Sequence, residues 1–394
     1  MSGQHSSTES LKKPLPAMIS NIGWGLLLLG AVCYVFGYLV DARHAAFVHV
    51  VNFLFLTSVG IGALFLIALE YIAGAVWSVP IRRVNEFLAA LIPFAALMAL
   101  PLFFHLSDLY QWVNAEIVAH DAVLKVKEPY LNVNFFTLRF VVIFGLWTMF
   151  FYLFTWNSQK QDIDKDQKHT KFNIGLAAAF IPIFAIGLTL VAIDWAMSLE
   201  PHWYSTIYGV YYFSGTVLAG VAAATYIIVK LHEHGYLPQL RRDHFYSLGT
   251  LMFVFINFWA YIAFSQFLLI WYANLPEETY WFIARWKNGW EYISVPLIIV
   301  HFAVPYFMLL SQDSKMDQKR LKFISIWVLF AHLLDLYWLV MPSFSASPVL
   351  SWMEITFPLF IVGLVIVIFG WKMKRQNLIP IGDPKLGRGL EFRL

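Results

Sequence analysis

Ionisable side chains near the ends of long apolar runs are the residues of this sequence best suited to chemistry. Asp194 follows about twenty residues without a formal charge, and Glu200 and His202 come soon after it. Asp335 lies near the end of a second apolar run in the same way. A carboxylate at the rim of such a run needs a partner or a function, because an unpaired charge is costly in an apolar medium.

Two histidine and aspartate pairs are spaced for one face of a helix. His105 precedes Asp108 by three positions, and His332 precedes Asp335 by three. Residues three apart are neighbours on a helix surface. An imidazole beside a carboxylate can accept a proton near neutral pH and pass it on. This chemistry suits the oxidation of a quinol, which releases two protons with its two electrons.

Three more ionisable residues fall within apolar runs. Arg139 is a counter-charge for an intramembrane carboxylate, and an ion pair that merely holds helices together is an equally open interpretation. His301 is expected at the depth of His332, where a b-type haem between the two rings is a less favoured alternative. Glu70 lies in the cytoplasmic third of its run, so it could reach the other groups only through a water-filled path.

The composition assigns the chain to a broad class. Of its 394 residues 60% are hydrophobic and 13% are charged, which indicates an integral membrane protein. A single cysteine, Cys33, excludes a disulfide framework, a cysteine-held iron–sulfur cluster and covalent haem in this chain. The formal charge of +3 is dispersed around helix ends, so no nucleic-acid partner is expected. Without a phosphate-binding Gly-Lys motif, ATP-driven transport is not expected either.

Ten apolar runs are long enough to cross a bilayer. They cover Met18 to Val40, Ala45 to Trp77, Phe87 to Ser107, Phe135 to Trp156, Phe172 to Met197, Ile207 to Leu231, Tyr246 to Ala273, Tyr292 to Leu310, Leu321 to Met341 and Leu350 to Met373. Of the 27 Lys and Arg residues, 21 lie on the N-terminal side of the membrane and five on the other. By the positive-inside rule both termini are cytoplasmic. The first run is too long for a cleaved signal peptide.

A repeated pattern suggests an internal duplication. DWAMSLEP from Asp194 and DLYWLVMP from Asp335 share their first and last residues, and HLSDLYQWVN from His105 aligns with SQFLLIWYAN from Ser265. The predicted fold is therefore an all-α polytopic membrane protein with ten transmembrane helices. Helices 2 to 5 and 6 to 9 form two related four-helix bundles, flanked by helices 1 and 10. The corresponding segments are 1–43, 44–203, 204–345 and 346–394. Gly60 and Gly62 predict close helix packing.

Two runs support a resemblance to a known family. DWAMSLEPHWYSTIYGVYYF (Asp194 to Phe213) and FSQFLLIWYANLPEETYWF (Phe264 to Phe282) closely resemble the ActF-type membrane subunit of bacterial alternative complex III, within the NrfD and PsrC-like family. The likeness extends over nearly the whole chain. It implies a quinol:electron-acceptor oxidoreductase in the bacterial cytoplasmic membrane, with a quinol such as menaquinol as substrate.

The resemblance also implies partners and site residues. The partners are a paralogous ten-span subunit, a multihaem cytochrome c and an iron–sulfur protein, so the c-type haems and iron–sulfur clusters belong to other chains. Asp194, Glu200 and His202 are carried over from the first run, and Ser265 and Gln266, near a possible quinol, from the second. The sister subunit remains an alternative place for the quinol site.

Three functions remain open. A quinol-contacting or proton-relaying subunit predicts that Asp194→Asn or Asp335→Asn lowers quinol oxidation in an assembled complex. A purely architectural anchor predicts that only loss of the outer segments, Asp108 to Asn134 and Asn274 to Glu291, releases partners. These segments are rich in Trp and Tyr, which fits a partner surface or an interfacial aromatic belt. A secondary transporter is the least favoured, because no interrupted helix is evident in the sequence.

Overall fold

The computed structural model describes residues 12–394, and every regular element in that range is helical. Ten helices are long and apolar enough to cross a membrane, so the chain is a multi-pass membrane protein. These spans are Ala17–Val40 (α1), Ala42–Ala73 (α2), Val79–Leu109 (η1 to α5), Val133–Asp164 (α8), Lys168–Leu199 (α9 and η4), Tyr208–Glu233 (α10), Arg242–Ala273 (α11), Glu291–Met308 (α13 to α14), Gln318–Ser343 (α16 and η6) and Trp352–Arg375 (α17).

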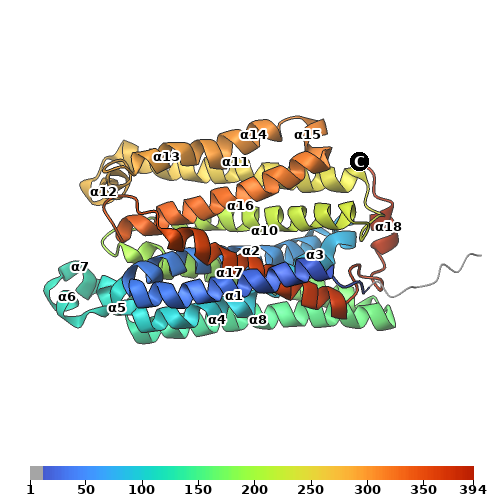
Figure 1. Ribbon diagram of the computed structural model, residues 1–394, viewed down its shortest axis with the longest axis horizontal. Coiled ribbons are helices and arrows are strands. Elements are labelled where there is room, and N and C mark those ends of the chain that lie inside the picture. The colour runs from blue at the N-terminus through green and yellow to red at the C-terminus, as the bar shows by residue number, and fades with distance from the viewer. Residues whose placement is uncertain (1–11) are drawn as a thin grey trace, which may run out of the picture.

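The spans run roughly parallel to one long axis and define two ends of the molecule (Figure 1). The cap end carries α5 (Leu106–Leu109), α6 (Ala115–His120), α7 (Ala122–Lys127) and α12 (Pro276–Ala284). The tail end carries α15 (Gln312–Met316) and α18 (Leu386–Leu390). The first residue of α1 and the last residue of α17 both lie at the tail end, as ten crossings require.

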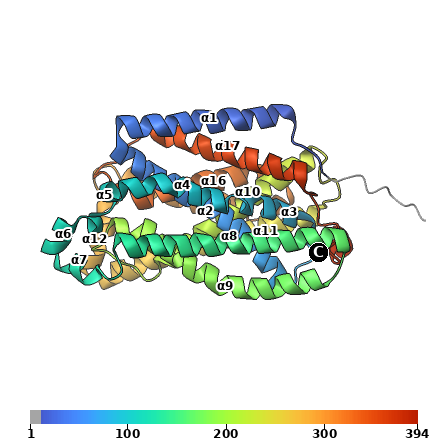
Figure 2. The same cartoon turned by 90° about the horizontal axis from the view of Figure 1, so that it is seen from below.

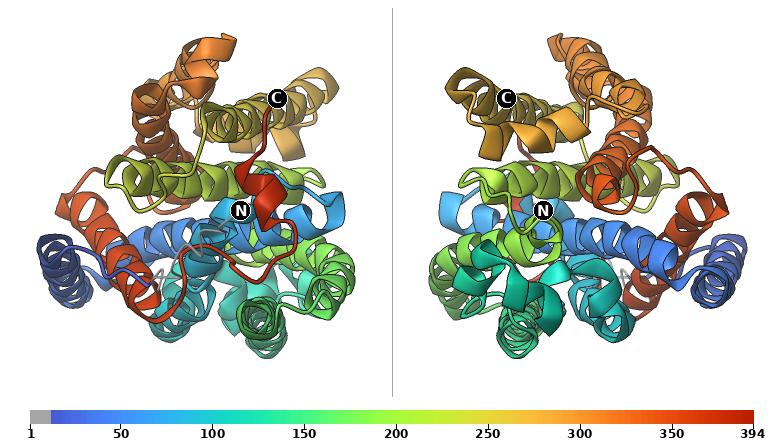
Figure 3. Two further views of the ribbon diagram at one scale, coloured as in Figure 1. Left: turned by 90° about the vertical axis from the view of Figure 1, so that its right-hand side faces the viewer. Right: turned by 90° about the vertical axis from the view of Figure 1, so that its left-hand side faces the viewer.

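Two helices form the centre of the molecule, as the end-on views show (Figure 3). α2 and α10 are the most buried spans and pack against each other. Gly62 and Gly220 allow this approach, because a Cβ on Gly220 would lie 2.7 Å from the carbonyl carbon of Gly62. The predicted close packing at Gly62 is thereby confirmed. α1 lies at the edge and packs along α17 (Figure 2).

Two spans are interrupted, which differs from the regular helices expected from the sequence. The third span is divided into η1 (Val79–Ile81), α3 (Arg82–Ala89), α4 (Ile92–Ala99), η2 (Leu100–His105) and α5. Pro93 and Pro101 each stand at the start of a new piece, where a missing N–H is tolerated. The eighth span is α13 (Glu291–Ile298), a π-helical turn η5 (Ile299–Ala303) and α14 (Val304–Met308). π-helical turns are frequent at functional sites.

The long segments at the cap end are ordered as short helices. Asn114 and Asp121 accept hydrogen bonds from the first backbone N–H groups of α6 and α7, which is the usual role of an N-cap residue. The first segment, 108–134, also contains the 3₁₀ turn η3 (Gln111–Val113). The second segment, 274–291, contains α12. α9 (Lys168–Trp195) and α16 (Gln318–Val340) each end in a 3₁₀ turn, η4 (Met197–Leu199) and η6 (Met341–Ser343). The helices that carry Asp194 and Asp335 therefore end alike.

Candidate functional site

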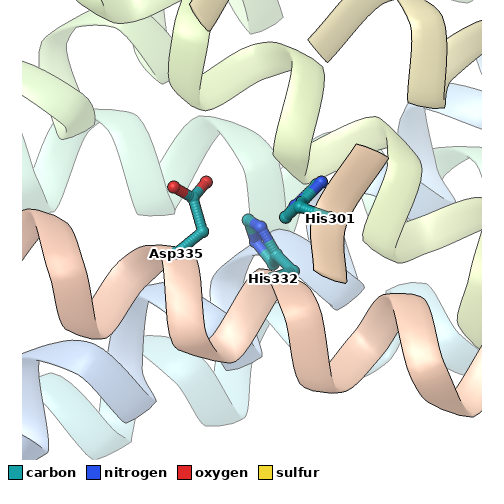
Figure 4. Close-up of side chains that lie close together, drawn as sticks. All are labelled: His301, His332 and Asp335. Carbon is teal, nitrogen blue, oxygen red and sulfur yellow. The ribbon is translucent and has the colours of Figure 1, made fainter. Parts of the chain in front are cut away.

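Asp335, His332 and His301 lie together inside the second half of the chain (Figure 4). Asp317 caps the N-terminus of α16 through the N–H of Lys319, and the uninterrupted helix then places His332 and Asp335 one turn apart on one face. The π-helical turn η5 supplies His301. All three side chains are at most 1% exposed. Two spans thus bring three titratable groups into one buried place.

The carboxylate of Asp335 is held by two neutral donors. The Tyr211 hydroxyl donates to its Oδ1 atom at 2.5 Å, and the indole N–H of Trp259 donates to its Oδ2 atom at 3.1 Å. No Lys or Arg lies within ion-pair distance of it in the part of the chain that the structure describes. A buried carboxylate without a cation is costly to keep ionised. Ionisable residues retained within a membrane span at such a cost are candidates for function.

The imidazoles are buried but lack hydrogen-bond partners. Both ring nitrogens of His301 and both of His332 have none among the described residues. His301 stacks on Trp259, with ring centroids 3.8 Å apart, and the two imidazole centroids are 6.4 Å apart. Gly215 on α10 makes room for His332, since a Cβ there would lie 2.7 Å from the ring. Unpaired buried polar atoms are uncommon in folded proteins, so these four nitrogens make the cluster a candidate site.

A largely apolar cavity of about 330 Å³ adjoins this cluster. Helices α10, α11, α12, α13 and α16, with η5, supply its walls. Its lining residues are Tyr211, Trp259, Ala260, Ala263, Phe264, Gln266, Phe267, Trp281, Phe282, Trp286, Ser294, Leu297, Ile298, Phe302, Trp338 and Leu339. Tyr211 and Trp259 form both the cavity wall and the hydrogen bonds to Asp335. The side chains of Tyr211 and Trp259 therefore connect a ligand in the cavity to the carboxylate of Asp335.

The cavity opens on the apolar flank formed by α11 and α13. Phe264, Trp286 and Ile298 line it and are also 61%, 44% and 55% exposed. The two polar lining groups away from Asp335 are Gln266 and Ser294. The Gln266 side chain is buried and its carbonyl oxygen is unpartnered, whereas Ser294 accepts from Trp338 at 2.7 Å. Ser265, its predicted companion, does not line the cavity.

Arg285 fixes the cap end of this cavity. The guanidinium donates to the backbone oxygens of Trp281, Trp338 and Leu339 at 2.9 to 3.2 Å and lies 3.4 Å from the ring centroid of Trp281. These bonds cap the C-terminal ends of α12 and α16, which both line the cavity. Burial lowers the pKa of Arg285 to about 9, which still leaves it charged near pH 7.

Asp194 is in a different environment from Asp335. Arg139 of α8 forms a two-point ion pair with it, Nε to Oδ2 at 2.7 Å and Nη2 to Oδ1 at 2.9 Å. Tyr130 donates to the same carboxylate at 3.1 Å, and its ring lies 3.9 Å from the guanidinium. Three donors thus hold this carboxylate. The structural ion pair that the sequence left open is the arrangement found.

The pair His105 and Asp108 lies elsewhere, on the partly exposed cap side of the first half. His105 Nδ1 and Asp108 Oδ2 are 2.9 Å apart. The His105 ring contacts Tyr38, whose hydroxyl is 2.7 Å from His49 Nδ1. This group is separate from the cavity.

His202 and Glu200 also lie outside the cluster, at the cap end. His202 Nε2 is 2.6 Å from Asp121 Oδ2, which ties the turn after η4 to the start of α7. Glu200 is half-buried in the same turn. Neither residue lines the cavity beside Asp335.

Glu70 belongs to a buried ion cluster at the tail end. Arg82 donates to Glu70 at 2.9 Å and to Asp383 at 2.6 Å, which fastens residues 376–394 to α2 and α3. Arg83 pairs with Glu86 and with Asp162 of α8 at 2.5 and 2.6 Å. These contacts explain the burial of Glu70 by ion pairing.

The predicted site residues therefore separate into groups. His301, His332, Asp335 and Gln266 lie at the cavity or directly behind its wall, and the other predicted residues do not. Tyr211 and Trp259 complete the site but were not predicted. Tyr211 belongs to the aromatic run GVYYF after His202, which was a usable signal, whereas Trp259 is one of 16 tryptophans and had none. No family model matches this chain, and no curated protein matches it at a significant level.

Proposed function

We propose that this chain is a membrane subunit of a quinol:electron-acceptor oxidoreductase and that quinol binds in the cavity beside Asp335. The resemblance to the ActF type of alternative complex III suggested the reaction. The positive-inside rule puts the tail end, where most Lys and Arg residues lie, in the cytoplasm. The cavity then belongs to the second of two related four-helix bundles, in the half of the membrane away from the cytoplasm.

The observation that carries this proposal is the joining of two features. An aromatic cavity opens on an apolar flank, and its inner wall hydrogen-bonds to a buried carboxylate. An isoprenoid quinol has an aromatic head with two hydroxyl groups and a tail that stays in the lipid. Sites for such ligands are mostly apolar with a few well-placed polar groups.

The chain's own residues account for the proton side of the reaction. The quinol ring packs against the indole of Trp259, and one hydroxyl reaches the Tyr211 and Asp335 wall. Tyr211 passes the proton to Asp335, and an imidazole of the cluster takes the second. The two electrons leave to a redox centre in a partner chain, and quinone remains. Positioned acids and bases of this kind contribute about 10²- to 10⁴-fold to a rate.

The cap end is suited to docking the electron-accepting partner. Its helices are short: α6 and α7 are ordered by N-caps and by the contact of His202 with Asp121, and α12 carries the aromatic residues 280–282. We place the multihaem cytochrome c and the iron–sulfur protein there, and the paralogous ten-span subunit beside the membrane spans.

A second role, architectural, is favoured for the first half of the chain by the Arg139 and Asp194 ion pair. A carboxylate that accepts two bonds from arginine and one from Tyr130 is held in place. Proton transfer through it would require breaking this pair inside the membrane. We therefore assign the chemistry to Asp335 alone of the two aspartates.

Photolabelling with an azidoquinone tests the location. In the intact complex we expect labelled peptides from α11 and α13 that contain Phe264 or Ile298, with labelling suppressed by excess quinol. Replacing Ala263 with Trp fills the cavity and abolishes the label, whereas Ala96→Trp in α4, at a position that is partly buried like Ala263 but does not line the cavity, serves as a matched substitution that leaves it. Quinol-suppressed label confined to another chain would contradict the proposal.

A further inference from the structure

His301, His332 and Asp335 form a constellation that suits a metal ion as well as a quinol. Each can offer one ligand atom, and these atoms all lie within 4.8 Å of one another. Two imidazole nitrogens and a carboxylate oxygen are a common ligand set for zinc. We propose that the three residues bind one divalent transition-metal ion of the zinc class.

The distances are compatible with a small adjustment of side chains. Zinc bonds of about 2.0 to 2.2 Å place the ligands of a tetrahedral site about 3.4 Å apart. The outermost ligand atoms must approach by about 1.4 Å, which rotation of the imidazoles can supply. Neither imidazole has a hydrogen bond to lose in doing so, because their four nitrogens are unpartnered among residues 12–394.

The surroundings already orient the carboxylate for such a site. Tyr211 and Trp259 hold its two oxygens, and outer-shell partners of this kind fix the direction of a metal ligand. Because Gly215 has no side chain, the His332 ring has room beside α10. Among residues 12–394 no cationic side chain lies within ion-pair distance of Asp335, so a bound cation would compensate its charge.

A metal ion at this site would bind the carboxylate and imidazole atoms that accept protons from quinol in the proposed function. Its consequence for activity therefore rests on the proposed function: zinc should inhibit quinol oxidation by the complex. Binding itself does not depend on that function and can be measured on the full chain alone. The two ideas can thus fail separately.

Metal binding to the purified chain in detergent tests the inference. After removal of metals with a chelator, the chain is loaded with Zn²⁺ or Co²⁺ and desalted, and metal is counted by mass spectrometry. We expect one tightly held ion per chain, and for Co²⁺ the visible ligand-field bands of mixed nitrogen and oxygen coordination. Asp335→Asn and His332→Gln should each weaken binding at least about tenfold, since even outer-shell changes cost 10- to 100-fold.

A matched control removes the two surface pairs. His105→Gln with His202→Gln eliminates the histidines that face Asp108 and Asp121, and this variant should keep the tight ion. His301→Asn gives a third test in case another variant does not fold, which thermal unfolding reports. No tight ion in the wild-type chain, or an ion retained equally by the folded variants of the cluster, would overturn the inference.

Discussion

Asp194 and Asp335 show how two similar residues acquire different roles. Each lies near the cap end of its helix, in a motif that ends in proline seven positions later. Asp194 accepts from Arg139, which lies on the span that precedes its helix, whereas Asp335 accepts from Tyr211 and Trp259. A guanidinium neutralises the carboxylate that it holds, whereas the uncharged hydroxyl and indole donors hold Asp335 without neutralising it. The difference lies in the partner.

The ion pair of Arg139 predicts a large effect on stability. Arg139→Met leaves the Asp194 carboxylate buried and unpaired, which should lower the free energy of unfolding by about 3 to 5 kcal/mol. Denaturation in mixed micelles measures it. Lys168→Met, which removes an exposed pair with Asp166 at 3.0 Å, should change stability by less than about 1 kcal/mol. Equal effects of the two substitutions would show that the buried pair does not hold α8 to α9.

The contact between Asp121 and His202 predicts a dependence on pH at the cap end. The N–H of Leu124 and then the His202 side chain hold the pKa of Asp121 below its usual 3.8. A lowered pKa stabilises the folded cap above the ordinary value, and this stabilisation is lost as the pH falls through the lowered pKa. Pepsin should therefore cut residues 121–134 increasingly as the pH is lowered from about 5 to about 3.

The matched variant for this experiment is Asp121→Asn, which cannot titrate. Its cleavage should show no step in that range beyond the change in pepsin activity, which an unrelated substrate calibrates. A wild-type chain that behaves like the variant would mean that Asp121 does not hold the start of α7.

At the residue scale the sequence predicted the three titratable groups that the structure brings together, but it did not predict their neighbours. Histidines and an aspartate inside apolar runs are rare enough to be noticed, so His301, His332 and Asp335 were predicted. Trp259 belongs to a residue type that is common in membrane proteins, and only its hydrogen bond to Asp335 distinguishes it, whereas Tyr211 lies in the aromatic run GVYYF. The same limit applies to Asp194, because the sequence could not pair Arg139 with it in space.

Among the elements, the contact of α2 with α10 sets the geometry of the whole bundle. Gly62 and Gly220 face each other, so backbone meets backbone with no side chain between. Close packing of small residues is a main source of helix association in membranes. α10 also carries Gly215 and Tyr211, so the position of this helix decides whether the wall of the cavity reaches Asp335.

Adding a methyl group at this contact should separate the helices. Gly220→Ala should lower the free energy of unfolding by about 1 to 3 kcal/mol, the usual cost of overpacking. Gly145→Ala in α8 and Gly175→Ala in α9 face open space, and there the gain in helix propensity should stabilise by up to about 1 kcal/mol. Thermal unfolding in one detergent compares the three. Stabilisation by Gly220→Ala would contradict the close approach.

The sequence predicted the ten spans well but not the breaks within them. Hydropathy depends on composition, which η2 and η5 share with the regular helices around them. The π-helical turn that carries His301 lies between Pro296 and Pro305, and proline removes backbone donors without fixing which alternative turn forms. The sequence also did not predict the short helices α6 and α7, which depend on Asn114 and Asp121 as N-caps.

For the whole molecule, the proposed function assigns a structural role to the first half and the chemistry to the second. The first half holds its charges in ion pairs, at Arg139 near the cap end and at Arg82 and Arg83 near the tail end. The second half contains the cavity, and within the described residues no Lys or Arg pairs with Asp335 there. Such a division is consistent with a duplicated bundle in which one copy became a scaffold.

Quinol oxidation by the assembled complex, compared between two aspartate variants, tests this account most directly. Asp335→Asn should lower turnover about 100-fold or more, the range expected for a lost proton acceptor. Asp194→Asn should leave turnover per assembled complex within about twofold, because Asp194 is assigned a structural role only. Normal turnover with Asp335→Asn, or a loss found only with Asp194→Asn, would contradict the placement of the chemistry beside the cavity.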